Sequence, residues 1–342
     1  MEKFHLGLIG CGAMANTYSR QFHNLKSRAQ MVVTADIDEG RAKRVAEKFE
    51  AKKAVTDYRE MLDDVDGVII ALPHHLHYEV AKECLEAGKH VLLEKPMANT
   101  EKECLDLMEI AKKADRVLML AYCMRYHPLV TKMKELLDEK VYGDVFQVSV
   151  WTEQHTEYPP EHWASKASQL GGGQLFSHGC HYIDILLWYL GRPIKGTHVG
   201  TNYGTPWMER EGTSNVAIEF EGGKLGYHFG TWGARGSRLR YSFHAHCTEG
   251  MIEAAISHGK LIAHANGEEK LLIEIEPGKH THKEVEHFLD CVETGQTPFT
   301  NVTEALQGLR VIWRLYQAEE ENLVADLRGL GLDEFDKKPM FK

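Results

Sequence analysis

The chain has 342 residues, of which 43% are hydrophobic and 26% are charged, a balance typical of a globular protein. Its formal net charge of -10 at pH 7 has the wrong sign for binding nucleic acid or an anionic membrane. This length exceeds one ordinary core, so we expect two domains. Seven cysteines without a Cys-x-x-Cys pair, together with no recognisable signal peptide or membrane-spanning apolar run, favour a reducing cytoplasm.

Residues 4–122 alternate short apolar runs with amphipathic stretches. Predicted strands are "FHLGLIG", "MVVTADID", "DGVIIALP", "HVLLEKP" and "VLMLAY", and helical periodicity separates them. Strands that are apolar throughout and joined by helices are typical of a parallel sheet covered on both faces. We therefore predict an N-terminal doubly wound parallel sheet, of the Rossmann type, over residues 1–123.

The pattern changes after residue 125. A helix over 129–139 precedes a strand over 145–155, and strands of alternating polarity follow from residue 193. These features predict a C-terminal α/β domain over 124–342 with a large, mainly antiparallel open sheet. Amphipathic helices over 283–293 and 303–320 are expected to cover one face of this sheet. Its other face then needs a partner, which favours a homodimer or homotetramer formed through the sheet.

A glycine loop follows the first predicted strand. The segment "GLIGCGAMA" places Gly10, Gly12 and Ala15 in the G-x-G-x-x-A spacing at the start of a helix. Gly10 permits a tight turn, Gly12 permits close approach of a pyrophosphate, and Ala15 permits close packing of helix on strand. With the strand, loop, helix and strand in this order, the spacing predicts a dinucleotide-binding site.

Asp36 ends the second predicted strand and bears on the choice of cofactor. A carboxylate at this place accepts hydrogen bonds from the ribose hydroxyls of NAD and repels the additional phosphate of NADP. Arg41 lies nearby and could accommodate that phosphate. The sequence therefore favours NAD and leaves NADP open.

The segment from His90 to Pro96, "HVLLEKP", delivers two opposite charges and a proline at the end of a buried strand. Ligands of an open parallel sheet bind beyond the carboxyl ends of its strands, so Glu94 and Lys95 lie where a ligand is expected. A proline here can hold a cis peptide bond. A lysine near a reacting hydroxyl or carbonyl stabilises negative charge on that oxygen.

These motifs occur in one order along the chain. The glycine loop is followed by "LPHHLHYEVAKECLEAGKHVLLEKP", "YCMRYHP", "GGGQLFSHGCHYIDILLWYLG" and "HFLDCVETGQTP". From residue 4 to about residue 320 the chain resembles the Gfo/Idh/MocA family, the glucose-fructose oxidoreductase and inositol dehydrogenase group. The resemblance implies a Rossmann domain, an α/β domain with an open sheet, a nicotinamide cofactor, and a sugar or polyol substrate between the domains.

The resemblance also implies site residues. Lys95 matches the active-site lysine of the family, and Trp163 resembles a tryptophan that precedes the glycine triplet. Aromatic side chains such as Tyr122 could pack against a sugar ring or belong to the core. The predicted cofactor-binding residues are Gly10, Cys11, Gly12, Ala13, Met14, Asp36, Ile37, Leu72, Pro73, His74, His77, Glu94 and Lys95. The predicted substrate-binding residues are Tyr122, Arg125, Trp163 and His178.

The predicted helix after the glycine triplet departs from the family pattern. In the family this helix usually presents an aspartate and, four residues later, a histidine; here the positions hold Ser177 and His181. Residues four apart share one helix face. The ordinary pKa of a histidine side chain suits a general base near neutral pH, so Lys95, His181 and Ser177 are the predicted catalytic residues.

Two alternatives accompany this prediction. The serine in place of the aspartate motivates an NAD-dependent glycosidase or lyase that oxidises a ring hydroxyl transiently and keeps its cofactor. A non-catalytic sensor is disfavoured because it needs neither Lys95 nor His181. Glu153, His155, His178 and His181 could suggest a metal site, but with 20 histidines in the chain chance clusters are expected, and no metal is predicted.

Overall fold

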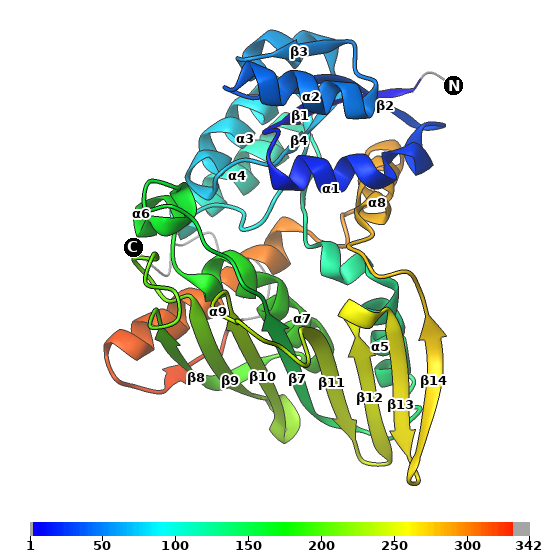
Figure 1. Ribbon diagram of the computed structural model, residues 1–342, viewed down its shortest axis with the longest axis vertical. Helices are drawn as coiled ribbons and strands as arrows, with labels where there is room; N and C mark the ends of the chain where they lie inside the picture. Colours follow the sequence, from blue (N-terminus) through cyan, green and yellow to red (C-terminus); the bar gives the residue numbers. More distant parts are fainter. Residues whose placement is uncertain (1–2, 331–342) are drawn as a thin grey trace. The chain divides into compact units, whose positions relative to one another are not determined.

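The computed structural model describes residues 3–330 and separates into two compact units (Figure 1). The first unit runs to Tyr126 and also includes Lys279–Val302, and the second contains His127–Gly278 and the chain from Thr303 onwards. The predicted boundary after residue 123 placed the segment 279–302 in the C-terminal domain, whereas the structure groups it with the first unit. The ends of the predicted domains, residues 1–2 and 331–342, lie outside the described residues.

The first unit is built on a six-stranded parallel sheet in the order β3-β2-β1-β4-β5-β6. Its strands are β1 (Phe4–Ile9), β2 (Ala29–Ala35), β3 (Lys53–Val55), β4 (Gly67–Ile70), β5 (His90–Leu93) and β6 (Leu118–Leu120). The strands are almost entirely buried, as apolar runs between helices predict. The predicted Rossmann sheet is confirmed.

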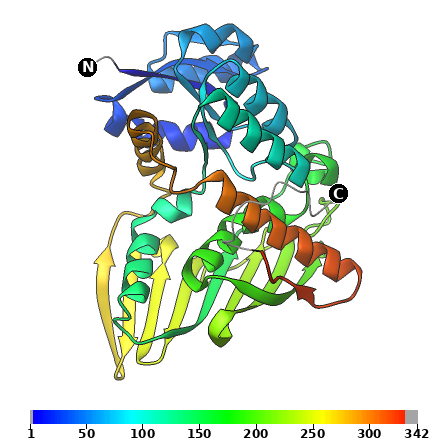
Figure 2. The same cartoon turned by 180° about the vertical axis from the view of Figure 1, so that it is seen from behind.

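Helices cover this sheet on both faces. They are α1 (Ala13–Gln21), α2 (Glu39–Phe49), α3 (His77–Glu86), α4 (Glu101–Ala114) and α8 (Thr281–Thr294), with short 3-10 turns η1 (Phe22–Leu25), η2 (Tyr58–Asp64), η3 (His74–Leu76) and η4 (Cys123–Tyr126). From β1 the chain adds β2 and β3 towards one edge of the sheet, and from β4 it adds β5 and β6 towards the other edge. Right-handed crossovers therefore put α1 and α2 on one face and α3 and α4 on the other (Figures 1 and 2).

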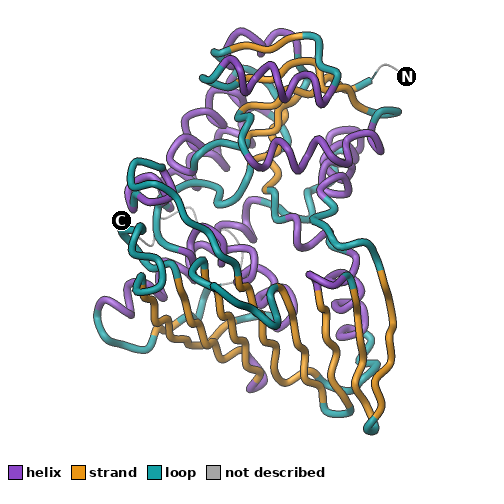
Figure 3. The backbone as a smooth tube through the Cα atoms, in the orientation of Figure 1, coloured by secondary structure: helices purple, strands orange, loops and turns teal. Residues whose placement is uncertain are grey.

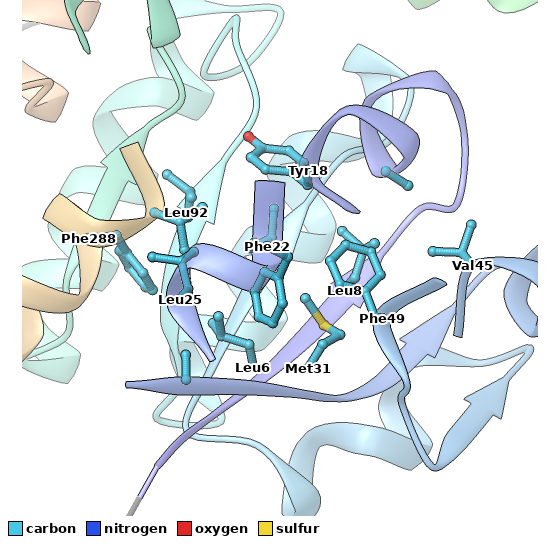
Figure 4. Packing of buried hydrophobic residues seen from close by; sticks show 14 of the residues in the cluster. Leu6, Leu8, Tyr18, Phe22, Leu25, Met31, Val45, Phe49, Leu92 and Phe288 are labelled. Carbon is cyan, nitrogen blue, oxygen red and sulfur yellow. The ribbon is translucent and has the colours of Figure 1, made fainter. Parts of the chain in front are cut away.

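Helix α8 joins the first unit because its apolar side chains complete that unit's core. Val285, Phe288 and Leu289 are buried in the same cluster as Leu25 and Leu92. Figure 4 shows Phe288 beside these residues. An amphipathic pattern predicts that a helix buries one face, but it does not say which sheet receives that face. This is why the sequence placed the helix on the wrong sheet.

The second unit is built on a nine-stranded sheet in the order β14-β13-β12-β11-β7-β10-β9-β8-β15 (Figure 3). Strands β7 and β10 are parallel and the other neighbours are antiparallel, which confirms a mainly antiparallel sheet. The strands are β7 (Val145–Glu153), β8 (Pro193–Thr201), β9 (Thr213–Phe220), β10 (Lys224–Thr231), β11 (Tyr241–Cys247), β12 (Gly250–Ala255), β13 (Lys260–Ala265), β14 (Glu268–Glu274) and β15 (Ala325–Asp326).

One face of this sheet carries the main helices. They are α5 (Pro128–Asp138), α7 (Cys180–Leu190) and α9 (Val302–Glu320), and Figure 2 shows them in front of the strands. The short elements are η5 (Trp163–Ser165), α6 (Ala167–Leu170), η6 (Leu175–Gly179), η7 (Glu221–Gly223) and η8 (Ile256–His258). Within residues 3–330, no helix has the length and apolar character needed to cross a membrane.

Candidate functional site

The glycine loop of the first unit leads from β1 into α1. Gly10 has a φ of +95°, and a Cβ atom there would lie 2.3 Å from the carbonyl oxygen of Ala71, so only glycine fits. Gly12 precedes α1, and a Cβ atom on it would meet nothing within 4 Å. The N-cap of α1 makes no side-chain hydrogen bond and its first turn has no acidic residue. Its backbone N–H groups form a site suited to a phosphate.

Asp36 is tied to this loop. The backbone N–H of Cys11 donates to Asp36 Oδ2 across 2.9 Å, and the N–H of Asp38 donates to Oδ1 across 2.9 Å. Arg41 also contacts Oδ1, at 3.1 Å. Burial, and then the Asp36 carboxylate, raise the pKa of the Cys11 thiol to about 12, so this thiol is neutral. Ile37, the residue after Asp36, is 90% exposed, so its side chain can pack against a flat apolar group of a ligand.

His77 bridges the two segments that follow β4 and β5. Its Nδ1 lies 2.7 Å from the carbonyl oxygen of Pro96, and its Nε2 lies 2.9 Å from that of Leu72. The side chain is fully buried, and His74 packs beside it with ring centroids 5.5 Å apart. Burial is the largest cause that lowers the pKa of His77, to about 4. A neutral imidazole carries a single N–H, so His77 donates to one of these two carbonyl oxygens and packs against the other, between segments of predicted cofactor-binding residues.

The Glu-Lys-Pro element follows β5 as the sequence predicts. The Glu94 N–H donates to the Ile70 carbonyl across 2.9 Å, and the Lys95–Pro96 peptide bond is cis. The Glu94 side chain is buried and its Oε1 accepts a hydrogen bond from Tyr18 Oη at 3.0 Å. Lys95 is only partly buried.

Two residues predicted to bind substrate lie in the interior of the first unit. Tyr122 is 2% exposed, and so is Arg125. The Arg125 guanidinium donates to the carbonyl of Phe299 at 3.2 Å and lies 5.4 Å from the centre of its ring. This arrangement connects η4 to the segment after α8. Substrate binding by Tyr122 and Arg125 stays a prediction.

In the second unit, the predicted catalytic helix begins with a π-helical turn, η6, before α7. Such turns are rare and are found often at functional sites. The turn carries Ser177 and His178, and His181 follows in the first turn of α7. Ser177 and His181 are buried, at 5% and 6% exposure, while His178 is half-buried. The rings of the two histidines lie 6.3 Å apart.

His178 lies in a polar cluster. Its Nε2 is 3.2 Å from Tyr182 Oη and 3.4 Å from Tyr241 Oη, and its Nδ1 is 3.4 Å from Gln174 Nε2. Tyr182 stacks on His228, whose Nε2 faces the Thr152 hydroxyl at 3.2 Å. Hydroxyl groups of this kind can orient an imidazole and exchange a proton with it.

Trp163 lies on the short turn η5 of the same unit. It packs against a small apolar cluster that includes Met208 and Trp232, and it is partly buried. Its ring lies 5.7 Å from that of His162. The structure therefore gives this tryptophan a packed position with some surface still accessible, as a ring-stacking side chain needs.

Sequence reasoning missed two residues, Glu211 and Tyr316, that hold the start of the predicted catalytic helix. Tyr316 Oη accepts from the N–H groups of Gly173 and Phe176 at 3.1 and 3.2 Å and donates to Glu211 Oε1 at 2.6 Å. The same carboxylate oxygen accepts from the N–H of Leu175 at 3.3 Å. Burial is the largest influence on the Glu211 carboxyl and raises its pKa.

The glycine triplet makes this clamp possible. A Cβ atom on Gly173 would lie 2.0 Å from the Glu211 carboxylate, and one on Gly172 would lie 2.5 Å from Phe176 Cβ. No local pattern marks Glu211 or Tyr316, which come from a loop and from α9, because their function depends on tertiary contacts. In the described part of the chain, no group of three or more His, Cys, Asp or Glu side chains is arranged to hold a metal ion.

The first unit thus has the sheet order, glycine loop and acidic residue of a dinucleotide-binding oxidoreductase domain. Residues 4–122 match the family described as "Oxidoreductase family, NAD-binding Rossmann fold", and residues 130–253 match the "GFO/IDH/MocA C-terminal domain". The chain belongs to the Gfo/Idh/MocA family of oxidoreductases.

Individual relatives agree with this assignment. The chain is 32% identical over 226 residues to "Inositol 2-dehydrogenase 2" of Saccharopolyspora erythraea, covering 65% of this chain and 64% of that protein. It is 27% identical over 286 residues to "Levoglucosan dehydrogenase" of Pseudarthrobacter phenanthrenivorans, covering 74% and 73%. A structure of levoglucosan dehydrogenase in complex with NADH and levoglucosan has the same fold, with a TM-score of 0.86 over 96% of this chain and all of that one, at 21% identity.

Proposed function

We propose that the protein is an NAD(P)-dependent oxidoreductase that transfers hydride between nicotinamide and a hydroxyl or ketone carbon of a sugar, sugar derivative or cyclic polyol. The observation that carries this proposal is the glycine loop joined to Asp36 by the Cys11 N–H. The inositol and levoglucosan dehydrogenases among the relatives support the substrate class.

The first unit supplies the cofactor site in this proposal. The N–H groups at the start of α1 bind the pyrophosphate, and the Asp36 carboxylate accepts hydrogen bonds from the ribose hydroxyls of NAD. When the cofactor binds, hydrogen bonds from the ribose hydroxyls replace the contact between the Asp36 carboxylate and Arg41. The bound nicotinamide supplies the hydride acceptor. The segments around Leu72, Pro73 and Glu94, between which His77 is packed, line the remainder of the cofactor site.

Lys95 and His181 are the proposed proton-relay residues. In alcohol oxidation, the carbinol carbon loses hydride to the cofactor while its hydroxyl loses a proton to His181. The Lys95 ammonium donates a hydrogen bond to the same oxygen and stabilises the developing negative charge. Ser177 and His178 bind further hydroxyls, and Trp163 packs against the ring of the substrate. Reduction of a ketone is the reverse of these steps.

Substrate-dependent formation of NADH tests this function. The purified protein is mixed with NAD, and in parallel with NADP, and a panel of inositols, anhydrosugars, aldoses and their lactones or ketones. We expect a change in nicotinamide absorbance with at least one compound of the panel, in one direction or the other. A protein that binds NADH but shows no turnover with any member would contradict the proposed substrate class.

The serine at position 177 supports a second candidate. Without the usual carboxylate, an NAD-dependent glycosidase or lyase could oxidise a ring hydroxyl, eliminate a leaving group and return the hydride to the substrate. Such an enzyme keeps its cofactor, so mass spectrometry of the protein after denaturation distinguishes the two. Near-equimolar NAD with glycoside cleavage and no net NADH favours this candidate, and a cofactor-free protein that forms NADH favours the dehydrogenase.

We further propose a cytoplasmic homodimer or homotetramer. All seven cysteines are free and buried, which suits a reducing compartment. On the sheet face that alternates away from the helices, Trp151 packs against Tyr227 and Phe229 with ring centroids 5.6 and 5.5 Å apart, and none of the three is fully buried. A second copy of this face is the proposed partner.

A further inference from the structure

A buried tyrosine hydroxyl lies between two carboxyl groups behind the Glu-Lys-Pro element. Tyr18 Oη is 3.0 Å from Glu94 Oε1 and 3.1 Å from Glu284 Oε1. Tyr18 comes from α1, Glu94 follows β5, and Glu284 comes from α8. All three belong to the first unit, and Figure 4 shows the Tyr18 hydroxyl at the edge of that unit's core.

The two contacts need two protons, and the tyrosine supplies one. A hydroxyl donates a single hydrogen, and an ionised carboxylate can only accept. If both carboxyl groups were ionised, two like charges would share one proton in the interior, where charge repulsion is poorly screened. The arrangement is therefore satisfied when one carboxyl is neutral and donates to the tyrosine oxygen, while the tyrosine donates to the other.

Burial identifies the neutral carboxyl as that of Glu284. Glu284 is fully buried, and its Oε2 has no hydrogen-bond partner among residues 3–330. Glu94 keeps 6% exposure. An ionised carboxylate with one oxygen unsatisfied in the interior is strongly disfavoured. Desolvation, followed by the charge of Glu94, raises the pKa of Glu284 well above its ordinary value.

Other charged and titratable groups face this cluster from the elements around it. Lys279, which precedes α8, is exposed, and its ammonium is 3.5 Å from Met14 Sδ. Burial raises the pKa of Glu284 and outweighs the positive charge of Lys279, which lowers it. The buried Cys123 thiol of η4 has its pKa raised to about 12 by burial and then by Glu284, so it remains neutral. Lys95 also acts on Cys123 electrostatically.

We propose that Glu284 is a neutral carboxylic acid at physiological pH and forms, with Tyr18, a hydrogen-bond chain that holds the Glu94 carboxylate next to Lys95. Glu284 is then a positioning residue that acts through Tyr18, from a helix more than a hundred residues away in sequence. Above the ordinary carboxyl pKa, Glu284 keeps its proton in the folded state and loses it in the unfolded chain.

Infrared difference spectroscopy of wild type against Glu284→Gln tests the proton directly. At about pH 7.5, we expect wild type to show a protonated carboxyl C=O band that Glu284→Gln lacks. Glu286→Gln, on the exposed side of the same helix, is the matched control and should keep the band. A wild-type spectrum without this band, or a band unchanged in Glu284→Gln, would overturn the proposal.

The pH dependence of folding gives a second readout. The ratio of folded to unfolded protein for Glu284→Gln, divided by that for wild type, should rise by up to tenfold per pH unit above the ordinary carboxyl pKa. A ratio that does not change with pH contradicts a neutral Glu284. If Glu284→Gln does not fold, Tyr18→Phe replaces it, and its carboxyl band should shift because the acid loses its acceptor; an unshifted band overturns the proposal.

The positioning part rests on the proposed function and is measured with NADH. As pH rises through the range where Glu284 loses its proton, NADH affinity should fall in wild type but stay constant in Glu284→Gln. Parallel profiles in the two proteins would overturn the positioning role. Absence of NADH binding in both would instead contradict the proposed function, while the infrared result would still decide whether Glu284 is neutral.

Discussion

The backbone N–H of Cys11 donates to the Asp36 carboxylate across 2.9 Å, so the glycine loop after β1 is joined to the acidic residue after β2. Asp36 also contacts Arg41 at 3.1 Å. One carboxylate therefore accepts from the loop and pairs with the nearby cation. In the proposed function it also accepts hydrogen bonds from the ribose hydroxyls of the dinucleotide. Cofactor choice should depend on this residue.

Replacing Asp36 with alanine should change the cofactor preference. Loss of a charged acceptor for the ribose hydroxyls is expected to weaken NADH binding by about tenfold to a hundredfold. NADPH binding should weaken less or improve, because Arg41 is released to meet its phosphate. Fluorescence titrations with both cofactors measure the ratio. Asp38→Ala, an exposed N-cap on the same loop, is the control, and equal losses of both cofactors in Asp36→Ala would contradict the role in selectivity.

Tyr316→Phe should loosen the start of the proposed catalytic helix. It removes the hydroxyl that accepts from Gly173 and Phe176, and leaves buried donors unsatisfied, at a cost of about 2–4 kcal/mol in the free energy of unfolding. Turnover should fall while NADH affinity is kept, because the change lies in the second unit. Urea denaturation and steady-state kinetics measure both.

The matched control for this variant is Tyr203→Phe. Tyr203 also belongs to the second unit, and its side chain is 93% exposed. This change should leave unfolding and turnover close to wild type. A Tyr316→Phe enzyme with wild-type stability and turnover would show that the clamp is dispensable.

His228 should make the protein sensitive to acid. Burial, and secondarily His198, lower the pKa of His228 to about 3, whereas the unfolded chain binds this proton near its ordinary pKa of about 6.5. The folded state therefore loses stability as pH falls from about 6.5 towards 3, by up to about 1.4 kcal/mol per pH unit. Above this window the contribution of His228 does not vary with pH.

The variant His228→Gln isolates this contribution. It is expected to be less stable than wild type at neutral pH because it loses the stacking on Tyr182, and the deficit should shrink as pH falls. Urea denaturation of both proteins across this range measures the difference. His258→Gln, at an exposed position, is the control. A deficit that does not depend on pH would mean that His228 is not the neutral buried group described.

A charge on the open sheet face should separate subunits. Phe229→Glu places a carboxylate among Trp151 and Tyr227, where a second sheet would have to bury it without a partner. Light scattering should show a smaller assembly than in wild type, with far-UV circular dichroism unchanged. Lys43→Glu, on the exposed surface of α2, serves as the control. A wild-type protein that is already monomeric, or an unchanged assembly in Phe229→Glu, would contradict this interface.

The sequence predicted the parts of the fold that depend on local patterns. Apolar strands between amphipathic helices predicted the parallel sheet, and the glycine spacing predicted the loop next to Asp36, which the structure joins by a hydrogen bond. The position of α8 and the contacts of Glu211 and Tyr316 depend on side chains that meet over long sequence separations. The π-helical turn at Ser177 follows the glycine triplet, and helical periodicity does not distinguish such a turn from an α-helix.

The most direct test of the central claim is steady-state turnover of wild type and Lys95→Met with NAD and the best compound of the sugar and polyol panel. Lys89→Met is the control for loss of a lysine. Lys89 precedes β5, at the end opposite Lys95, and its ammonium donates to the carbonyl oxygen of Val65. We expect Lys95→Met to lose at least about a hundredfold in kcat/KM, since the change removes a group that stabilises the reacting oxygen. Full turnover in Lys95→Met would contradict it.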